Sequence, residues 1–315
     1  MFSNISFRFT ARHGIMLILM SALMWGTVGV ATKGIYTLSD TNALSIGFFR
    51  LMFASPALLL TCWLLLGKRM FQISLRDLGL MALMGVMMAL YQVCYFASIA
   101  YVGVSIAVLV TLCTAPVMVA LLAAFFLKER LGGMVLLALV CAIAGTTMLV
   151  WVEPGTASQN SNTLMGVLLA LGSALGYAVL TLVSRSLSGH YHPIQPISIG
   201  FSAGALMLLP FALANGLVST YPGEAWLLLV YMGLVPTALA YILFLTGIRY
   251  TTATVASILT LIEPLTSTLL AWYLFGEQFS QYGWFGALLL LSAIGLLYKG
   301  SDQPAPQPEP EPANA

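Results

Sequence analysis

Charged residues are scarce in this sequence, because Asp, Glu, Lys and Arg occupy only 7% of its 315 positions. Soluble domains carry about 25% of such residues, so a water-facing surface cannot be built from this chain. Hydrophobic residues occupy 60% of the positions instead. The net charge of +2, without a basic stripe that carries interleaved aromatics, argues against a nucleic-acid partner.

Sequence motifs of nucleotide, hydrolase and metal chemistry are also missing. No G-x-x-x-x-G-K-[ST] sequence is present, which argues against ATP-driven pumping, and no H-E-x-x-H or G-x-S-x-G sequence supports a membrane hydrolase. His190 and His192 share a predicted loop but have no third ligand, so we expect no metal site and no cofactor. The four cysteines form no C-x-x-C pair, and we predict that they are small buried hydrophobic residues.

Ten apolar segments have the roughly 20 residues that a helix needs to cross a hydrocarbon core. They cover residues 14–33, 43–66, 78–99, 103–126, 133–152, 163–184, 195–215, 224–246, 252–275 and 281–299. The connections between them are too short to hold a soluble domain. We therefore predict an all-α integral membrane fold with about ten transmembrane helices. Residues 301–315 alternate Pro with Gln, Glu and Ala, a composition that predicts a disordered tail.

Basic residues in the short loops predict the orientation, because cytoplasmic loops are enriched in Lys and Arg. With the N-terminus inside, only Lys33 faces outside, and ten basic residues face the cytoplasm. These are Arg8, Arg12, Lys68, Arg69, Arg76, Lys128, Arg130, Arg185, Arg249 and Lys299. We therefore expect residues 1–13 and 300–315 to be cytoplasmic. The first apolar stretch is expected to remain as a membrane helix, because no cleavable signal peptide is present.

The two halves of the sequence resemble each other. Residues 21–25 (SALMW) match residues 173–177 (SALGY), and Pro116 and Pro264 are each followed by a glutamate thirteen residues later. Any single match is weak among apolar residues, but two matched sites in the same order indicate an internal duplication.

The duplication divides the chain into a first repeat at residues 14–152 and a second at residues 163–299. Each repeat holds five predicted helices, and an odd number makes the second copy enter the membrane from the opposite side. Inverted-topology repeats are typical of secondary transporters, in which two similar halves exchange conformations and expose one site to each side in turn. This repeat is the main argument for transport.

Two ionisable residues, Arg50 and Glu263, lie well inside predicted helices, where a charge costs at least about 2.5 kcal/mol. Their similar depth predicts that they meet or share a ligand. A mutual salt bridge that holds helices together is the structural alternative, and Arg50 is also long enough to snorkel to the outer interface. Glu263 is a candidate for proton coupling as well, because buried carboxyl groups serve in proton relays.

Polar and aromatic residues at helical spacing surround these two charges in the predicted helices. The residues that we predict to bind substrate are Trp25, Arg50, Tyr91, Gln92, Tyr95, Tyr177, Tyr241, Thr260, Glu263 and Ser267. The helix of Tyr241 also carries Thr237. The alternative for the Ser and Thr residues is helix packing, because small residues let backbones approach closely. We expect the two charges to hold the ends of a small zwitterion and the aromatic rings to surround its apolar part.

Over residues 14–299 the sequence resembles the drug/metabolite transporter (DMT) superfamily, in its EamA-type branch of ten-helix carriers. The residues that carry the resemblance are Trp25-Gly26, Arg50, 96–129 with Pro116, and 246–277 with 254–258, Glu263-Pro264 and Gly276-Glu277. The resemblance implies a bacterial inner-membrane carrier, often an exporter of amino acids, related metabolites or toxic compounds, with a central cavity between two inverted repeats. Ala115 stands where the second repeat has Glu263, so the membrane carboxylate is not duplicated.

The leading interpretation is a secondary-active or facilitative transporter, not an enzyme, that exports amino acids or related metabolites by alternating access. A small molecule, the lipid bilayer and, as coupling ion, protons are the expected partners. A drug or toxic-compound efflux carrier of the same family is an alternative. An integral membrane enzyme that acts on a lipid, and a structural or sensory subunit that docks through the proline-rich tail, are the rivals from other classes.

Overall fold

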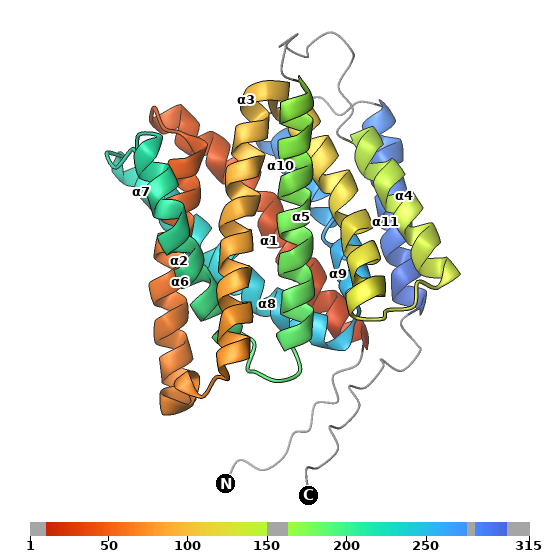
Figure 1. Ribbon diagram of the computed structural model, residues 1–315. Coiled ribbons are helices and arrows are strands. Elements are labelled where there is room, and N and C mark those ends of the chain that lie inside the picture. The colour runs from red at the N-terminus through yellow and green to blue at the C-terminus, as the bar shows by residue number, and fades with distance from the viewer. Residues whose placement is uncertain (1–10, 150–162, 276–280, 301–315) are drawn as a thin grey trace, which may run out of the picture.

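The computed structural model describes residues 11–149, 163–275 and 281–300, and over these residues helices joined by short connections are the only regular structure (Figure 1). The first half comprises α1 (Ala11–Leu38), α2 (Ala43–Leu66), the 3-10 turn η1 (Gly67–Phe71), α3 (Leu75–Phe126) and α4 (Gly133–Leu149). The second half comprises α5 (Thr163–Leu187), α6 (Ile194–Ala214), α7 (Gly223–Gly233), the π-helical turn η2 (Leu234–Leu239), α8 (Ala240–Gly247), the 3-10 turn η3 (Ile248–Tyr250), α9 (Ala253–Leu259), α10 (Ile262–Phe275) and α11 (Gln281–Gly300). The proline-rich tail at 301–315 and Glu277 lie outside the described residues.

The described helices are long and apolar enough for a membrane protein. Eight of them have the length and hydropathy to cross a membrane, and two shorter apolar helices cover Val110–Phe126 and Gly133–Met148. Each of the ten predicted segments has a counterpart among these helices. Large apolar side chains such as Leu164, Leu206 and Leu227 are exposed, as expected for surfaces that face lipid. The prediction of an all-α membrane fold with about ten helices is therefore confirmed.

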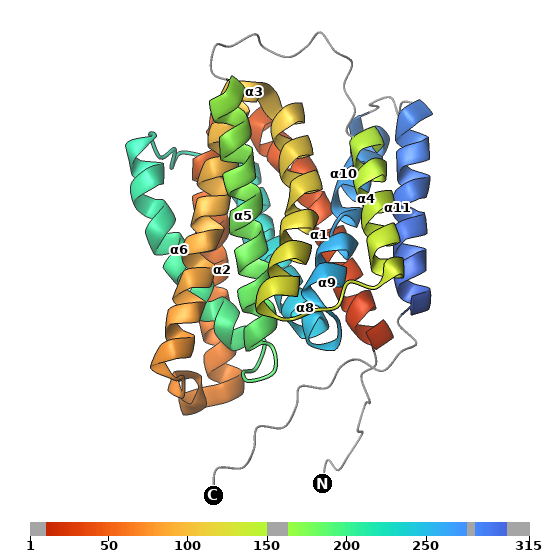
Figure 2. The same ribbon diagram turned by 45° about the vertical axis from the view of Figure 1, so that its right-hand side comes forward.

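Helix α3 contains two of the predicted segments. The connection predicted between residues 99 and 103 is helical, so α3 runs unbroken for 52 residues, which would be about 78 Å long if the helix were straight. Figure 2 shows that α3 instead bends back on itself, with an ascending first limb and a descending second limb. One continuous helix therefore makes two passes.

The helix predicted at residues 252–275 is divided into α9 and α10, and Pro264 explains the division. Proline has no N–H, so it cannot bond the carbonyl of Thr260 four residues earlier. The backbone N–H of Glu263 bonds that carbonyl instead, at 3.0 Å, and tightens the chain there. Pro116 stands at the matching place in the first half, but α3 continues through it.

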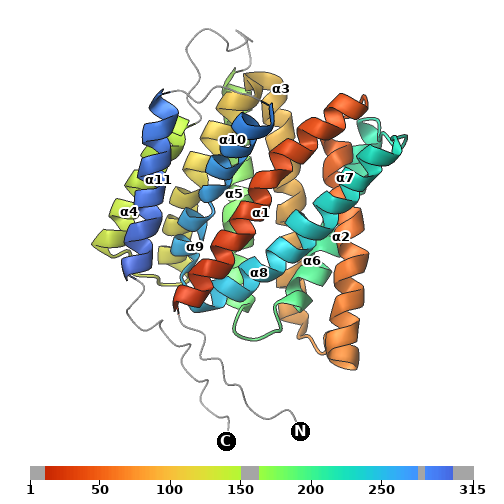
Figure 3. The same ribbon diagram turned by 180° about the vertical axis from the view of Figure 1, so that it is seen from behind.

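The helices pack in a pattern that is unchanged when the two halves are exchanged. In the second half, α5 packs against both limbs of α3, and in the first half α1 packs against α8 and α10 (Figures 2 and 3). Helices α2 and α6 contact each other, and so do α4 and α11. Helices α1 and α5, which begin the two halves, run in opposite directions (Figure 1). This arrangement is that of two inverted five-helix repeats.

Two equivalent glycines show the same relationship at the level of single residues. A Cβ atom on Gly14 of α1 would lie 2.8 Å from the Cβ of Tyr250, and one on Gly166 of α5 would lie 2.8 Å from the Cβ of Tyr101. Real Cβ atoms do not approach so closely, so both positions require glycine. Each half thus places its first helix against the end of the third helical pass of the other half.

One face of the molecule gathers the helix ends that carry basic residues. Helices α1 and α3 begin there, and α2, α3, α5, η3 and α11 end there (Figure 1). By these bounds the described residues predicted to be cytoplasmic lie at this face, which we call the basic face. Lys33 lies toward the other end of α1.

Candidate functional site

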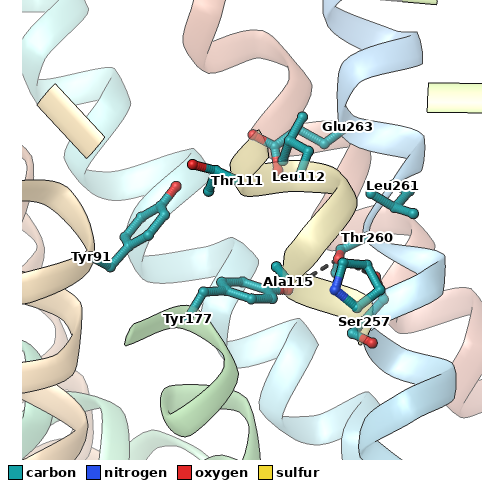
Figure 4. Close-up of a pocket in the computed structure, with 10 residues that line it drawn as sticks. Tyr91, Thr111, Leu112, Ala115, Tyr177, Ser257, Thr260, Leu261 and Glu263 are labelled. Carbon is teal, nitrogen blue, oxygen red and sulfur yellow. Dashed lines mark hydrogen bonds between the residues drawn. The ribbon is translucent and has the colours of Figure 1, made fainter. Parts of the chain in front are cut away.

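A small cavity lies where α3 of the first half meets α5, α9 and α10 of the second (Figure 4). Tyr91 and Tyr177 approach it from the first limb of α3 and from α5. The other lining residues come from the second limb of α3 and from the region where α9 gives way to α10: Thr111, Leu112, Ala115, Pro116, Ser257, Thr260, Leu261 and Glu263. The cavity therefore sits between the halves and is built by both.

The break between α9 and α10 sets the polarity of one cavity wall. The hydroxyl of Thr260 donates its hydrogen to the carbonyl of Ser257, at 2.8 Å. Its oxygen also lies 3.0 Å from the hydroxyl of Tyr177. Since a threonine hydroxyl has a single hydrogen, Tyr177 must be the donor in this second bond. The Tyr177 oxygen is left with lone pairs only, so it can serve as an acceptor for a ligand.

Glu263 provides a carboxyl group at the same wall. It lies in the first turn of α10, where a helix favours an acidic side chain. Within the described part of the chain, the carboxylate accepts no side-chain hydrogen bond, and Arg50 is the charge that acts on it. A carboxylate without a hydrogen-bonding partner in a membrane interior is suited to binding a cation or a proton.

Arg50 lies on α2 and supplies the positive charge of the region. Its Nε–H donates to the hydroxyl of Thr237 in η2, at 3.2 Å. Tyr241, Tyr91 and Glu263 are the ionisable groups that lie near enough to act on it electrostatically. No direct ion pair within 4.0 Å joins Arg50 to Glu263 among the described residues. The salt bridge considered as an alternative is therefore not formed, and the two opposite charges lie near each other without direct contact.

Aromatic rings surround the two charges. Trp25 packs against Tyr241, with ring centroids 4.8 Å apart, and Tyr91 lies 6.2 Å from Tyr177 and 6.3 Å from Tyr95. The indole N–H of Trp25 is buried and has no hydrogen-bond partner among the described residues. Such an unused donor in an apolar interior is costly unless another group binds to it. These aromatic rings, which we call the aromatic wall, therefore include a hydrogen-bond donor that is free to bind another group.

Four of the ten residues predicted from the sequence line the cavity: Tyr91, Tyr177, Thr260 and Glu263. Another five do not line it: Trp25, Arg50, Gln92, Tyr95 and Tyr241. The side-chain oxygen of Gln92 is buried and has no hydrogen-bond partner within the described part of the chain. Ser267 lies apart from the cavity and packs against Gly29 of α1, where a Cβ atom would meet its hydroxyl at 2.7 Å.

The sequence prediction did not include the apolar part of the lining. Thr111, Leu112 and Ala115 come from the second limb of α3 and form the wall on that side of the cavity. A proline at the next position, Pro116, was the one sequence signal there, and its match with Pro264 could have pointed to this wall. Ser257 precedes Thr260 and Glu263 at helical spacing, and this spacing was the only sequence signal that pointed to it.

The cavity has a volume of about 30 Å³. A water molecule needs about 10–15 Å³ of such space, so the cavity accommodates water but not an amino acid in this conformation. The cavity between the two halves is therefore too small for such a substrate in this conformation.

Comparisons with known proteins agree with this architecture. The sequence model of the EamA-like transporter family matches residues 12–151 and 164–299. An uncharacterized transporter of Bacillus subtilis, YwfM, is 30% identical over 90% of this chain and 92% of its own length. An uncharacterized inner membrane transporter of Salmonella typhimurium, YicL, is 28% identical over 94% of this chain and 98% of its own length. A crystal structure with 18% identity has a TM-score of 0.79 and covers 92% of this chain and 98% of that chain, which shows a shared fold.

Proposed function

Because the chain belongs to the EamA-like transporter family within the DMT superfamily, we propose that it exports amino acids or closely related zwitterions across the inner membrane. It acts as a secondary-active or facilitative carrier. Family membership supports transport itself, and the choice of a zwitterion rests on the charges at the site.

The observation that carries the proposal is the separation of Arg50 and Glu263. Each is an ionisable group inside a membrane domain, and no direct ion pair joins the two among the described residues. An amino acid fits this arrangement, because its carboxylate can pair with Arg50 while its ammonium group pairs with Glu263. The hydrogen of the Tyr177 hydroxyl is committed to Thr260, so its oxygen can accept a hydrogen bond from the ammonium end.

Alternating access follows from the exchange symmetry of the packing. In the proposal, the repeats at residues 14–152 and 163–299 rock against each other and open the cavity to one side at a time. In the proposal the basic face is the cytoplasmic one, because cytoplasmic loops are enriched in Lys and Arg. Residues 1–13 and 300–315 then lie in the cytoplasm. Neither half needs to unfold for the site to change sides.

Glu263 is also the proposed coupling group. With no side chain donating to it in the described residues, its carboxylate can hold either a proton or the ammonium group of the substrate, but not both. Competition between the two at one group would exchange protons for substrate. Export would then be driven by proton entry.

Efflux of drugs or other toxic compounds is the second candidate, and the aromatic wall favours it. Trp25, Tyr91 and Tyr241 offer flat apolar surfaces that suit larger apolar cations, with Glu263 as the counter-charge. A lipid-modifying enzyme has no comparable support, since the relatives named above are described as transporters.

The test is counterflow in liposomes that contain the purified full-length protein. Liposomes are loaded with one unlabelled amino acid at a time, and uptake of the same labelled compound is measured. Accumulation with one class of amino acid, absent from protein-free liposomes, supports the proposal. Counterflow with apolar cations alone would replace it with the efflux function, and the formation of a chemically altered product would replace it with an enzymatic one.

A further inference from the structure

The π-helical turn η2 contains a proline that leaves one backbone group without its normal partner. In an α-helix the N–H of Pro236 would bond the carbonyl of Met232, but proline has no N–H. The hydroxyl of Thr237 donates to this carbonyl at 2.6 Å. The proline therefore explains both the irregular turn and the direction of the Thr237 hydroxyl hydrogen.

The same hydroxyl faces Arg50 with its oxygen. Its hydrogen is committed to Met232, so toward the Nε–H of Arg50, at 3.2 Å, it can only accept. Thr237 is fully buried, so water cannot replace it as the acceptor. The bond holds Nε and leaves the two terminal nitrogens of the guanidinium, the fork that binds a carboxylate in two-pronged fashion, for another partner.

The backbones of α2 and α7 approach closely beside this bond. A Cβ atom on Gly233 would lie 2.6 Å from the Cβ of Phe53 and 3.1 Å from the carbonyl oxygen of Arg50. The turn that carries Thr237 is thus fixed against the turn that carries Arg50. Irregular π-turns inside α-helices are frequent at functional sites, and here the irregularity lies beside the buried arginine.

We propose that Thr237 is a positioning residue that aims the guanidinium of Arg50 at the carboxylate of the transported molecule. The inference rests on the proposed function, because it takes Arg50 to be the carboxylate partner. Without the hydroxyl, Arg50 keeps its charge but loses the bond that fixes the orientation of its fork. Thr237 therefore sets the preference for substrates that carry a carboxylate over those that lack one.

The experiment compares two Thr237 variants in liposomes that contain the full-length protein. Thr237→Val keeps the shape and removes the hydroxyl, and Thr237→Ser restores the hydroxyl. Thr246→Val is the matched control, since the Thr246 hydroxyl bonds only the carbonyl of Ile242 in its own helix. Competition against the labelled amino acid is measured with two unlabelled probes, the same amino acid and its amide, which lacks the carboxylate.

Thr237→Val is expected to weaken competition by the amino acid about tenfold, the effect of losing one hydrogen bond to a charged group, with competition by the amide unchanged. Thr237→Ser and Thr246→Val are expected to match the wild type for both probes. An equal loss for both probes in Thr237→Val, or no loss for either, overturns the positioning role. Melting temperatures of the detergent-purified variants show whether a loss of competition reflects misfolding. If Thr237→Val is misfolded, the deciding result is whether competition by the amino acid in Thr237→Ser returns to the wild-type level.

Failure of the proposed function gives a different result. Two results would contradict the proposed function and the positioning role together. Either the wild type transports no amino acid, or the unlabelled amino acid competes as well in Arg50→Gln as in the wild type, so that Arg50 is not the carboxylate partner. If Arg50→Gln loses the preference for the carboxylate while Thr237→Val keeps it, the proposed function stands and the positioning role alone is wrong.

Discussion

The carboxylate of Glu129 lies 2.8 Å from the backbone nitrogen of Ala253 and caps the first turn of α9. It also accepts the backbone and side-chain donors of Thr254, at 3.3 and 3.0 Å. Lys128, with a φ of 53°, turns the chain out of α3 just before it. Because the N-terminal end of a helix carries unpaired N–H groups and a partial positive charge, the first half thus holds the second at the basic face.

Removing this cap is predicted to destabilise the protein. Glu129→Ala should lower the free energy of unfolding by about 0.5–2 kcal/mol, as for other lost N-terminal caps. The measurement is the melting temperature of the protein purified in detergent. Glu224→Ala is the control, because Glu224 lies exposed in the first turn of α7. Equal melting temperatures for the two variants would contradict a structural role of the Glu129 cap.

The glycines that occupy equivalent places in the two halves make a second prediction. Gly14→Ala and Gly166→Ala should each destabilise the protein by about 1–3 kcal/mol, because the added methyl group overlaps a tyrosine Cβ. Gly295→Ala in α11 adds the same methyl where nothing lies within 4 Å, and it should be neutral or slightly stabilising. Thermal unfolding of the three variants checks this. If only one of the first two is sensitive, the halves are not packed equivalently at this contact.

The number of helices was predictable from the sequence because a bilayer requires apolar segments of a minimum length. The junction inside α3 was not, since residues 99–102 form helix where the sequence predicted a connection between two helices. The effect of the two prolines was also not predictable from residue type. Pro264 divides its helix into α9 and α10, whereas α3 continues through Pro116, although both positions hold the same residue type.

The charged part of the site could be found from the sequence, whereas its apolar part could not. Arg50 and Glu263 stand out because ionisable residues are rare in membrane helices. Leu112 and Ala115 line the cavity but look the same in the sequence as residues that face lipid or another helix. Ser267 was predicted to bind substrate because it follows Glu263 at helical spacing. Small residues that pack helices together have the same spacing, and here Ser267 packs against Gly29.

The proposed orientation predicts which loops a membrane-impermeant thiol reagent can reach. Asn215, after α6, and His190, after α5, are both exposed and lie on opposite faces (Figure 1). In intact cells, Asn215→Cys should be labelled and His190→Cys should not. Both should be labelled in permeabilised cells, which controls for reactivity. The reverse pattern in intact cells would place the basic face outside.

His192 at the basic face predicts a dependence of stability on pH. Burial, and next the charge of Arg249, lower the pKa of this histidine below its ordinary value. Its Nδ1 accepts the backbone N–H of Ile194 at 3.4 Å, which requires the neutral ring. The folded state therefore binds the proton less well than the unfolded chain does. Stability should be unaffected above the ordinary histidine pKa of about 6.5 and should fall as the pH drops below it.

The measurement for His192 is the difference in melting temperature between pH 7.5 and pH 5.5. His192→Asn keeps a polar side chain that does not titrate, so it should reduce that difference. The reduction is expected to be small, because the side chain is partly exposed and solvent screens its charge. A pH dependence that is the same in both proteins would assign the titration to other groups.

Opposite effects of the two buried charges on two half-substrates are the sharpest test of the site. Glu263→Gln and Arg50→Gln each remove one charge and keep a polar side chain of similar size. If the site binds a zwitterion, an amine that lacks the carboxylate should compete through Glu263, and an acid that lacks the amine should compete through Arg50. Glu263→Gln should therefore weaken competition by the amine alone, and Arg50→Gln competition by the acid alone, each by about tenfold or more.

The matched controls are Glu224→Gln and Arg76→Gln, which remove the same charges at exposed positions. They should leave competition by both half-substrates unchanged. If the two charges served only to hold α2 and α10 in place, each buried variant would instead weaken the amine and the acid alike, because a distorted cavity does not distinguish one end of a ligand from the other. The crossed pattern therefore separates recognition from folding, whichever zwitterion the protein carries in the cell.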